Sequence, residues 1–189
     1  MSKDSSTTGA SIEKYRVYLA FLVRTYVSKH LDAKVDLSGI VQQTMLEAHQ
    51  NRHQWKPLPE EEQMAYLRRI AANNARDQAR KYATGKRDVR REQSLDDDFE
   101  RSSICLMNMA VADVPSPSIQ LSKAERAIQL AAAMERLPDS QREALMLQYW
   151  EQMSLKEIAD RMNRSPEAIA GLIRRGVRQL RQDMDNPSD

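Results

Sequence analysis

The chain has 189 residues and a formal net charge of +2, which allows one large domain or two small ones and says little about partners. Its single cysteine, Cys105, excludes an internal disulfide framework and a zinc site built from several cysteines, as suits a reducing cytosol. The N-terminus lacks the apolar stretch of a signal peptide, and no run approaches the roughly 18 apolar residues of a membrane span. We therefore expect a soluble, cytoplasmic protein without membrane insertion.

The composition favours helices throughout the chain. Only five glycines and two phenylalanines occur, 30% of the residues are charged, and no segment shows a sustained period-two strand pattern. We therefore predict an all-α fold of two small helical domains joined by an acidic linker, with a helix-turn-helix in the C-terminal domain.

Residues 12–91 are predicted to form the first helical domain, after a disordered tail over residues 1–11. Apolar residues recur at helical spacing in two successive segments, until Pro57 and Pro59 break the second one. A third segment begins with acids and ends with bases, which is the order that a helix dipole favours. Near one stripe of the first helix lie Val17, Ala20, Phe21, Arg24 and Val27.

Residues 92–121 are predicted to be the acidic linker. Between Glu92 and Asp113 six acids accompany a single base, and the prolines of the VPSPS run bar a continuous helix. The apolar run ICLMNM within this stretch indicates that part of it packs on another element. The second helical domain is expected over 122–189, with Ser122 as N-cap and Glu125 completing a capping box.

Two stretches of the chain are strongly basic. Nine bases and two acids lie from Met64 to Arg91, and five arginines and one acid lie from Arg164 to Gln182. Basic patches of this kind are typical of nucleic-acid-binding surfaces, although solvated helix faces give the same counts.

Residues 154–181, SLKEIADRMNRSPEAIAGLIRRGVRQLR, have the pattern of a helix-turn-helix. A short amphipathic helix precedes a break at Asn163-Arg164, and Ser165 and Pro166 suit the N-cap and first position of a second helix. That helix is expected to bury Ile169, Leu172, Ile173, Gly176 and Leu180. Its outward face would carry Glu167, Ala170, Gly171, Arg174, Arg175, Arg178 and Arg181.

The outward face of this second helix suits close contact with DNA. Ala170 and Gly171 lack bulk, so the backbone could lie near the floor of a groove while the arginines hold phosphates or a guanine edge. A helical hairpin with a basic rim and no DNA contact would show the same pattern.

In the first domain, RRIAANNARDQARK predicts a helix with two distinct sides. Leu67, Ile70, Ala71 and Asn74 lie on one of them. Asn and Arg can hydrogen-bond exposed base edges, and Arg or Lys can hold a single-stranded backbone. The alternative to a nucleic-acid-binding role is a structural one, in which Asp77 and Lys81 form an ordinary i, i+4 ion pair that only supports the helix. The other side carries Arg69, Asn73, Arg76, Asp77 and Arg80.

These stretches resemble a known family. YLRRIAANNARDQARK is similar to the Arg-Ile-Ala-x-Asn-x-x-x-Asp-x-x-Arg signature of sigma region two, and IVQQTMLEAH to the helix that precedes it. The stretch from LPDSQREALMLQYW to RRGVRQLR resembles sigma region four. Together they cover most of residues 12–184 without a region-three domain, which resembles the extracytoplasmic-function (ECF) sigma factors of bacterial RNA polymerase.

The resemblance implies a promoter-specificity subunit that binds core RNA polymerase and promoter DNA and has no cofactor. An anti-sigma factor is a candidate for a further partner, although the sequence does not establish that one exists. The acidic linker would thread toward the active-site channel of the polymerase. Gln42, Gln43 and Leu46 would dock on the polymerase clamp. The minus-ten strand would be held by Arg69, Asn73, Arg76, Asp77, Arg80 and Lys81. The minus-thirty-five element would meet Arg164, Ser165, Glu167, Ala170, Gly171, Arg174, Arg175 and Arg178.

The sequence also departs from the family pattern. Ser38 and Gly39 stand where two acids are frequent, and Ala170 and Leu172 stand where Lys or Arg is common, so a family-typical promoter is not assumed. His49 and His53 have a spacing that could hold a metal, but no third ligand is evident and no metal site is predicted.

The chain lacks a nucleophile–base set and a Gly-rich phosphate loop, so we do not expect an enzyme.

Two other functions remain open from the residues alone. The chain could be a helix-turn-helix regulator that acts without polymerase, with residues 12–91 as a sensor or dimerisation domain. It could also be a helical adaptor without a DNA role.

Overall fold

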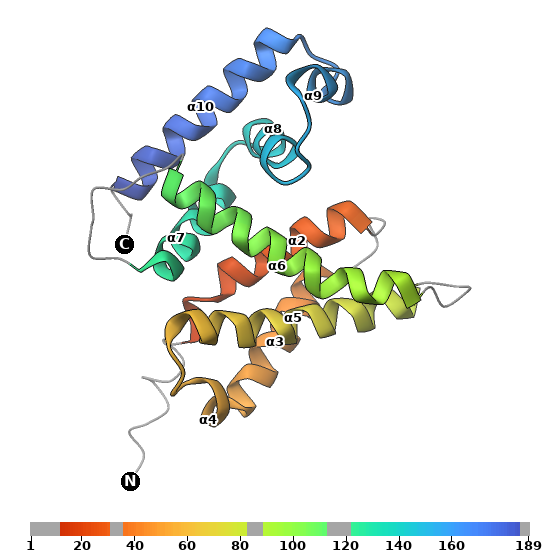
Figure 1. The fold of residues 1–189 in the computed structure, drawn as a ribbon, viewed down its shortest axis with the longest axis vertical. Coiled ribbons are helices and arrows are strands. Elements are labelled where there is room, and N and C mark those ends of the chain that lie inside the picture. The colour runs from red at the N-terminus through yellow and green to blue at the C-terminus, as the bar shows by residue number, and fades with distance from the viewer. Residues whose placement is uncertain (1–11, 31–35, 83–88, 113–121, 186–189) are drawn as a thin grey trace. The chain divides into compact units, whose positions relative to one another are not determined.

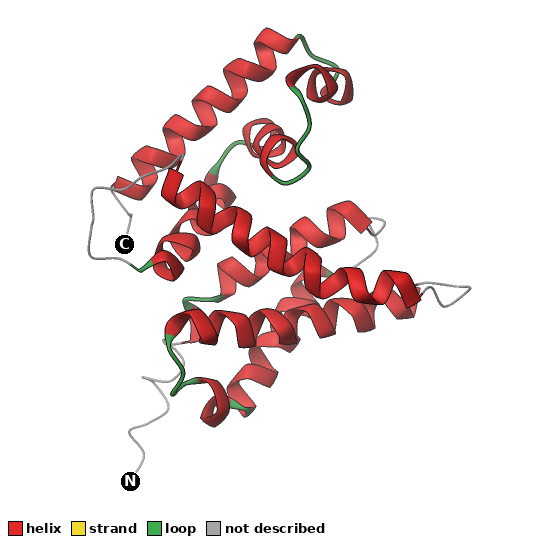
Figure 2. Ribbon diagram, in the orientation of Figure 1, coloured by secondary structure: helices red, strands yellow, loops and turns green. Residues whose placement is uncertain are grey.

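The structure is a computed structural model that describes residues 12–30, 36–82, 89–112 and 122–185. Every regular element in these residues is a helix, which confirms the all-α prediction (Figure 2). The chain divides into two compact units, Met1–Ser103 and Ile104–Asp189. No helix in the described ranges is long and apolar enough to cross a membrane. The predicted disordered tail, 1–11, lies outside the described residues.

The first unit is built from α2 (Arg16–His30), α3 (Leu37–Gln50), α4 (Arg52–Trp55), α5 (Glu60–Tyr82) and the first part of α6 (Val89–Ala112) (Figure 1). Helices α2, α3 and α5 pack against one another. Trp55 closes one end of their core: its ring packs edge-on against that of Tyr15, and its Nε1 donates to the Ala48 carbonyl oxygen at 2.8 Å. Because α2 packs against both α3 and α5, most of it is buried. The core of the first unit includes Tyr18, Leu19, Phe21, Leu22, Ile40 and Leu67.

Local signals set where the helices of the first unit begin. Asp36 caps α3, because its Oδ1 accepts a hydrogen bond of 2.9 Å from the Gly39 backbone. A Cβ atom at Gly39 would lie 2.6 Å from the Asp36 carboxylate, so the missing side chain makes room for the cap. Helix α5 starts with three consecutive acids after Pro59, as its dipole favours.

Residues 89–112 form helix α6, which differs from the linker predicted from residue 92. The physical reason is that this stretch contains no proline or glycine and repeats large apolar residues at helical spacing. Phe99, Leu106 and Met109 are buried, so the prediction that the ICLMNM run packs on another element is confirmed. The division between the two units falls after Ser103, not at residue 91. The VPSPS run lies outside the described residues.

In the described residues, the second unit contains the last part of α6 from Ile104, followed by α7 (Lys123–Arg136), α8 (Asp139–Tyr149), α9 (Leu155–Met162) and α10 (Pro166–Asp185). The capping box predicted for Ser122 and Glu125 is present at the start of α7. Helix α10 packs against α7, α8 and α9 (Figure 1). At Gly176 it lies close to α8, because a Cβ atom there would lie 2.9 Å from Cδ1 of the buried Leu145.

Candidate nucleic-acid interface

Helices α9 and α10 are joined by a tight turn whose geometry follows from local capping. Ser154 forms a capping box with Glu157 at the start of α9, and hydrogen bonds from Ser154 lower the pKa of the Glu157 carboxyl. Asn163 ends α9 with a left-handed backbone, φ 50° and ψ 54°. The Ser165 hydroxyl oxygen then accepts from the Ala168 backbone at 3.2 Å, and Pro166 opens α10. The predicted break, N-cap and first helical residue are all confirmed.

The buried stripe of α10 fixes which side chains face outward. Ile169, Leu172, Gly176 and Leu180 are buried, as predicted, while Ile173 is only half-buried. All residues predicted to meet the minus-thirty-five element therefore lie on the turn or on the outward side of α10. Ala170 and Gly171 are half-buried. The exposed members of the set are Arg164, Ser165, Glu167, Arg174, Arg175 and Arg178.

Gly171 lies within the outward side of α10. A Cβ atom there would lie 3.2 Å from Nη1 of Arg175 and would meet no backbone beyond its own helix. Because the Arg175 side chain is exposed and flexible, the absence of a side chain at Gly171 is not needed for packing. This position therefore leaves the α10 backbone open to close approach from outside.

On α5 the two predicted sides are also separated. Leu67 and Ala71 are buried, and Ile70 and Asn74 are half-buried. The opposite side carries the residues predicted to hold the minus-ten strand. Arg76 is half-buried. The exposed members of that set are Arg69, Asn73, Asp77, Arg80 and Lys81.

Contacts among these α5 residues run along the helix surface. Arg76 Nη1 donates to Asn73 Oδ1 at 2.7 Å, and Arg80 Nη1 lies 3.7 Å from Asp77 Oδ1. The i, i+4 pair suggested for Asp77 is thus replaced by an i, i+3 pair. Arg69 places its guanidinium 5.6 Å from the Tyr66 ring centroid, within the range of a cation–π contact. The exposed side of α5 therefore presents the Asn73 amide and the Asp77 carboxylate among several arginine and lysine side chains.

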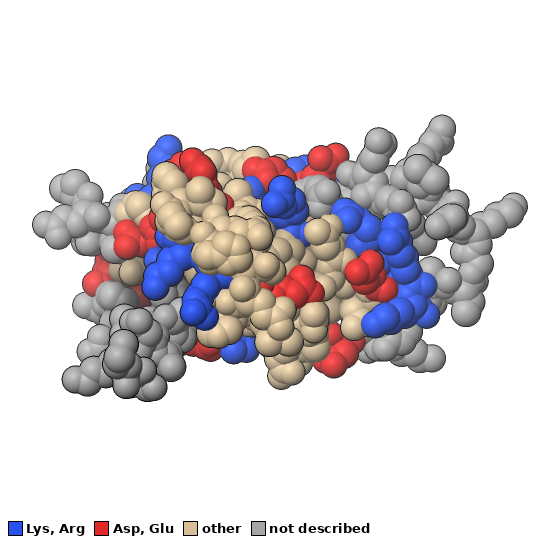
Figure 3. All heavy atoms as spheres, turned by 90° about the horizontal axis from the view of Figure 1, so that it is seen from below, with Lys and Arg blue, Asp and Glu red and all other residues tan. Residues whose placement is uncertain are grey.

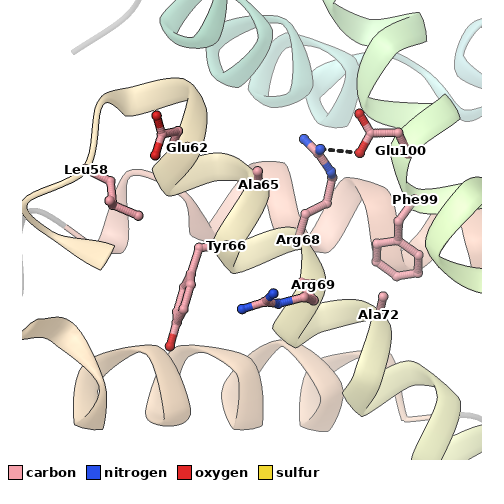
Figure 4. A pocket seen from close by; sticks show the side chains of 9 residues that line it. All are labelled: Leu58, Glu62, Ala65, Tyr66, Arg68, Arg69, Ala72, Phe99 and Glu100. Carbon is pink, nitrogen blue, oxygen red and sulfur yellow. Dashed lines mark hydrogen bonds and ion pairs between the residues drawn. The ribbon is translucent and has the colours of Figure 1, made fainter. Parts of the chain in front are cut away.

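Sequence reasoning missed a pocket of about 480 Å³ beside this side of α5 (Figure 4). Arg68 points from α5 toward Glu100 of α6, whereas Arg69 points toward Tyr66. No local pattern links Glu100 to Arg68, because the two residues are 32 positions apart in the sequence. The pocket is lined by Leu58, Glu62, Ala65, Tyr66, Arg68, Arg69, Ala72, Phe99 and Glu100.

The residues predicted to dock on polymerase lie together on the outer side of α3. Gln42, Gln43 and Leu46 are all exposed, and Leu46 keeps 50% of its surface exposed. The Gln43 side-chain amide donates to Glu47 Oε1 at 2.7 Å. His49 is exposed at the end of the same helix, and no group of three metal-ligating side chains occurs among the described residues.

On the face seen in Figure 3, the charged surface is mixed rather than uniformly basic. Figure 3 shows acidic and basic side chains interspersed on the face seen from below, with the largest group of basic side chains at the side where α5 ends. The bases are therefore concentrated toward the end of the helix that carries the predicted strand-binding set.

Two helical units, the second with a helix-turn-helix, define a DNA-binding class of protein. Family models assign both: "Sigma-70 region 2" matches residues 13–84, and "Sigma-70, region 4" matches residues 127–180. The chain belongs to the sigma-70 family and is an ECF-like RNA polymerase sigma factor, with core RNA polymerase and promoter DNA as its partners. Because both regions match, the polymerase-independent regulator and the adaptor are set aside. Sigma factors as a family are not enzymes.

One solved structure is similar to the chain, in the cocrystal structure of the flagellar sigma/anti-sigma complex, Sigma-28/FlgM. The match covers 100% of both chains at 17% sequence identity and a TM-score of 0.41. No curated protein matches the chain.

Proposed function

We propose that three separate surfaces of this sigma factor divide the work of promoter recognition. The outer side of α3, with Gln42, Gln43 and Leu46, docks on core polymerase. The exposed side of α5 holds the non-template strand of the minus-ten element, and the outward side of α10 meets the minus-thirty-five element. The observation that carries this assignment is the separation of each set from the buried stripe of its own helix.

The chemistry of each surface supports its role. Leu46 is one of few large apolar side chains exposed in the described residues, which suits a protein contact. Asn73 and Asp77 offer hydrogen-bonding groups to unpaired base edges, and the neighbouring arginines offer cations to a backbone. On α10, Arg174, Arg175 and Arg178 are exposed beside the small Ala170 and Gly171, as a helix in a major groove requires.

The proposal also includes the cellular location and the regulation of this sigma factor. A subunit of RNA polymerase acts in the cytoplasm without membrane insertion, and an anti-sigma factor that covers one of the three surfaces would regulate it. No cofactor or metal is needed, because the proposed roles are binding and positioning only.

Reconstituted transcription tests the proposal. The purified chain is mixed with core RNA polymerase and a genomic template library, and transcript start sites are mapped. We expect initiation at a defined set of promoters with wild-type protein, and none with core alone. Leu46→Asp should lose polymerase binding, whereas Glu61→Gln, an exposed change on α5 outside the three sets, should not. A folded protein that directs no start site on the whole library would refute the proposal.

A further inference from the structure

The first part of α6 is attached to the first unit by both apolar and polar contacts. Phe99 is 1% exposed, and its ring centroid lies 5.6 Å from that of Tyr26. Glu100 pairs with Nη2 of Arg68. Ser103 Oγ accepts hydrogen bonds from Arg68 Nη1 at 3.1 Å and from the Tyr18 hydroxyl at 2.8 Å. Residues 99–103, called the acidic clasp below, are therefore fixed to α2 and α5.

The contact with Arg68 removes this arginine from the basic surface. The Arg68 side chain is 12% exposed, whereas that of Glu100 is 52% exposed. Ser103 and Tyr18 are fully buried, and burial raises the pKa of the Tyr18 phenol, which keeps it protonated as a donor. Arg68 is thus held by two α6 partners, and its positive charge is offset by the Glu100 carboxylate.

The acidic clasp also forms one wall of the pocket that Arg69 lines. Phe99 and Glu100 line it from α6, while Tyr66, Arg68 and Arg69 line it from α5 (Figure 4). The half-exposed carboxylate of Glu100 therefore lines the same pocket as Arg69, the first arginine of the strand-binding set. A phosphate brought to Arg68 would be repelled by this carboxylate, because the two like charges would lie closer than the screening length of about 8 Å.

We propose that the acidic clasp is an autoinhibitory contact that competes with a single nucleic-acid strand for Arg68. Glu100 occupies the Arg68 guanidinium in the free protein, and a strand that crosses α5 at Arg68 and Arg69 must displace it. Displacement frees one further cation for a phosphate and removes one negative charge from the pocket. The inference rests on the proposed strand binding by α5 and adds a regulated state to it.

Equilibrium binding of a single strand tests the clasp. The full chain is titrated into a fluorescein-labelled 20-nucleotide poly-thymidine, and anisotropy is measured at several salt concentrations. Glu100→Gln should bind about threefold or more tightly than wild type at low salt, and its log–log salt slope should be steeper by about 0.7, the value for one additional phosphate. Asp97→Asn is the matched control, because it removes the same charge from an exposed position of the same helix that does not line the pocket.

Equal affinity and slope for Glu100→Gln and Asp97→Asn would overturn the clasp, because net charge alone would then explain any change. Hydrogen exchange of the full chain adds an independent measurement. Amides of residues 99–103 should exchange faster when the oligonucleotide is bound to wild type, and unchanged or slower exchange would also overturn the inference.

A double variant separates this inference from the proposed function. Arg69→Ala with Asn73→Ala removes two members of the strand-binding set and leaves the clasp contacts in place. If this variant binds the oligonucleotide as wild type does, the proposed role of α5 fails. If it loses binding while Glu100→Gln behaves like Asp97→Asn, the role of α5 stands and only the clasp fails.

Discussion

The Asn74 side-chain amide of α5 donates a hydrogen bond of 3.2 Å to Oγ1 of Thr44 in α3, and Thr44 in turn donates to the Ile40 carbonyl oxygen at 2.8 Å. Thr44 is fully buried and Asn74 is half-buried. This pair joins the helix of the proposed polymerase surface to the helix of the proposed strand-binding surface. It is one of the contacts that hold the two surfaces in place relative to each other within the first unit.

Thr44→Val should therefore destabilise the first unit although it preserves the shape of the side chain. The half-buried Asn74 amide would lose its acceptor, at a cost of about 0.5–1.5 kcal/mol. Urea denaturation followed by Trp55 fluorescence, in a Trp150→Phe background, measures this. Thr44→Ser keeps the hydroxyl and serves as control for the lost methyl group. If Thr44→Val unfolds at the same urea concentration as the parent, the hydrogen bond does not support the packing of α3 on α5.

Asn73→Ala and Asp77→Ala should impair promoter opening more than polymerase binding. Both side chains are exposed on α5, where they would meet unpaired bases only after the strands separate. Permanganate footprinting of the open bubble, with holoenzyme assembly measured in parallel, checks this. Asn73→Asp is the companion variant, because it keeps an acceptor for Arg76 Nη1 while it removes the amide donor and adds one negative charge. An undiminished bubble in both alanine variants would contradict the assignment.

Where the sequence predicted the fold well, the signal was local. The turn between α9 and α10 depends on Asn163, Ser165 and Pro166, and the contacts of these residues are with close neighbours in the sequence. The two sides of α5 follow from helical periodicity alone, and Leu67 and Ala71 are buried as expected. The structural role of such residues is determined by their immediate neighbours in the sequence, so it can be predicted from the sequence.

Where the prediction failed, the determining contacts join distant residues. Arg68 was counted with the basic surface, because nothing near it in the sequence reveals its pairing with Glu100. Helix α2 is apolar on several sides, so periodicity did not orient it: Val17, expected on one stripe with Phe21, is 37% exposed, while Phe21 is 2% exposed. The acids of residues 92–113 indicate a linker, whereas the apolar spacing of the same stretch favours the helix that the structure has over residues 89–112.

Gly176→Ala and Gly171→Ala should change stability in opposite directions, although both lie in α10. A Cβ atom at Gly176 would lie 2.9 Å from the buried Leu145 side chain, and such overpacking costs about 1–3 kcal/mol. At Gly171 the nearest group is the end of an exposed arginine, so the helix should gain about 0.5–1 kcal/mol from the lost freedom of glycine. Thermal denaturation compares the two variants, and equal melting temperatures would contradict the close packing of α8 and α10.

The first unit should lose stability at alkaline pH in a way that depends on Tyr18. Burial raises the pKa of this phenol above its ordinary value of 10.0, because the phenolate is poorly solvated in the core. The folded state then binds a proton that the unfolded state releases, so this stability is complete below pH 10 and is lost as the pH rises above it. Tyr18→Phe should show a shallower decline in urea denaturation between pH 9 and 11, which is about the range in which an ordinary tyrosine titrates. Identical declines would exclude Tyr18 as the group that titrates.

Gly171→Leu should block DNA binding by α10 without unfolding it. The Cβ atom of the added side chain would displace only the end of the exposed Arg175 side chain, but the leucine would stand between the α10 backbone and the floor of a groove. Arg174→Ala should instead weaken binding by about 1–3 kcal/mol with relaxed base preference if Arg174 meets a guanine edge, or reduce the salt slope by about 1 if it meets a phosphate. Holoenzyme binding to a mapped promoter at several salt concentrations, with circular dichroism as the control for folding, distinguishes these outcomes. Wild-type affinity in a folded Gly171→Leu protein would show that this side of α10 does not lie in the groove.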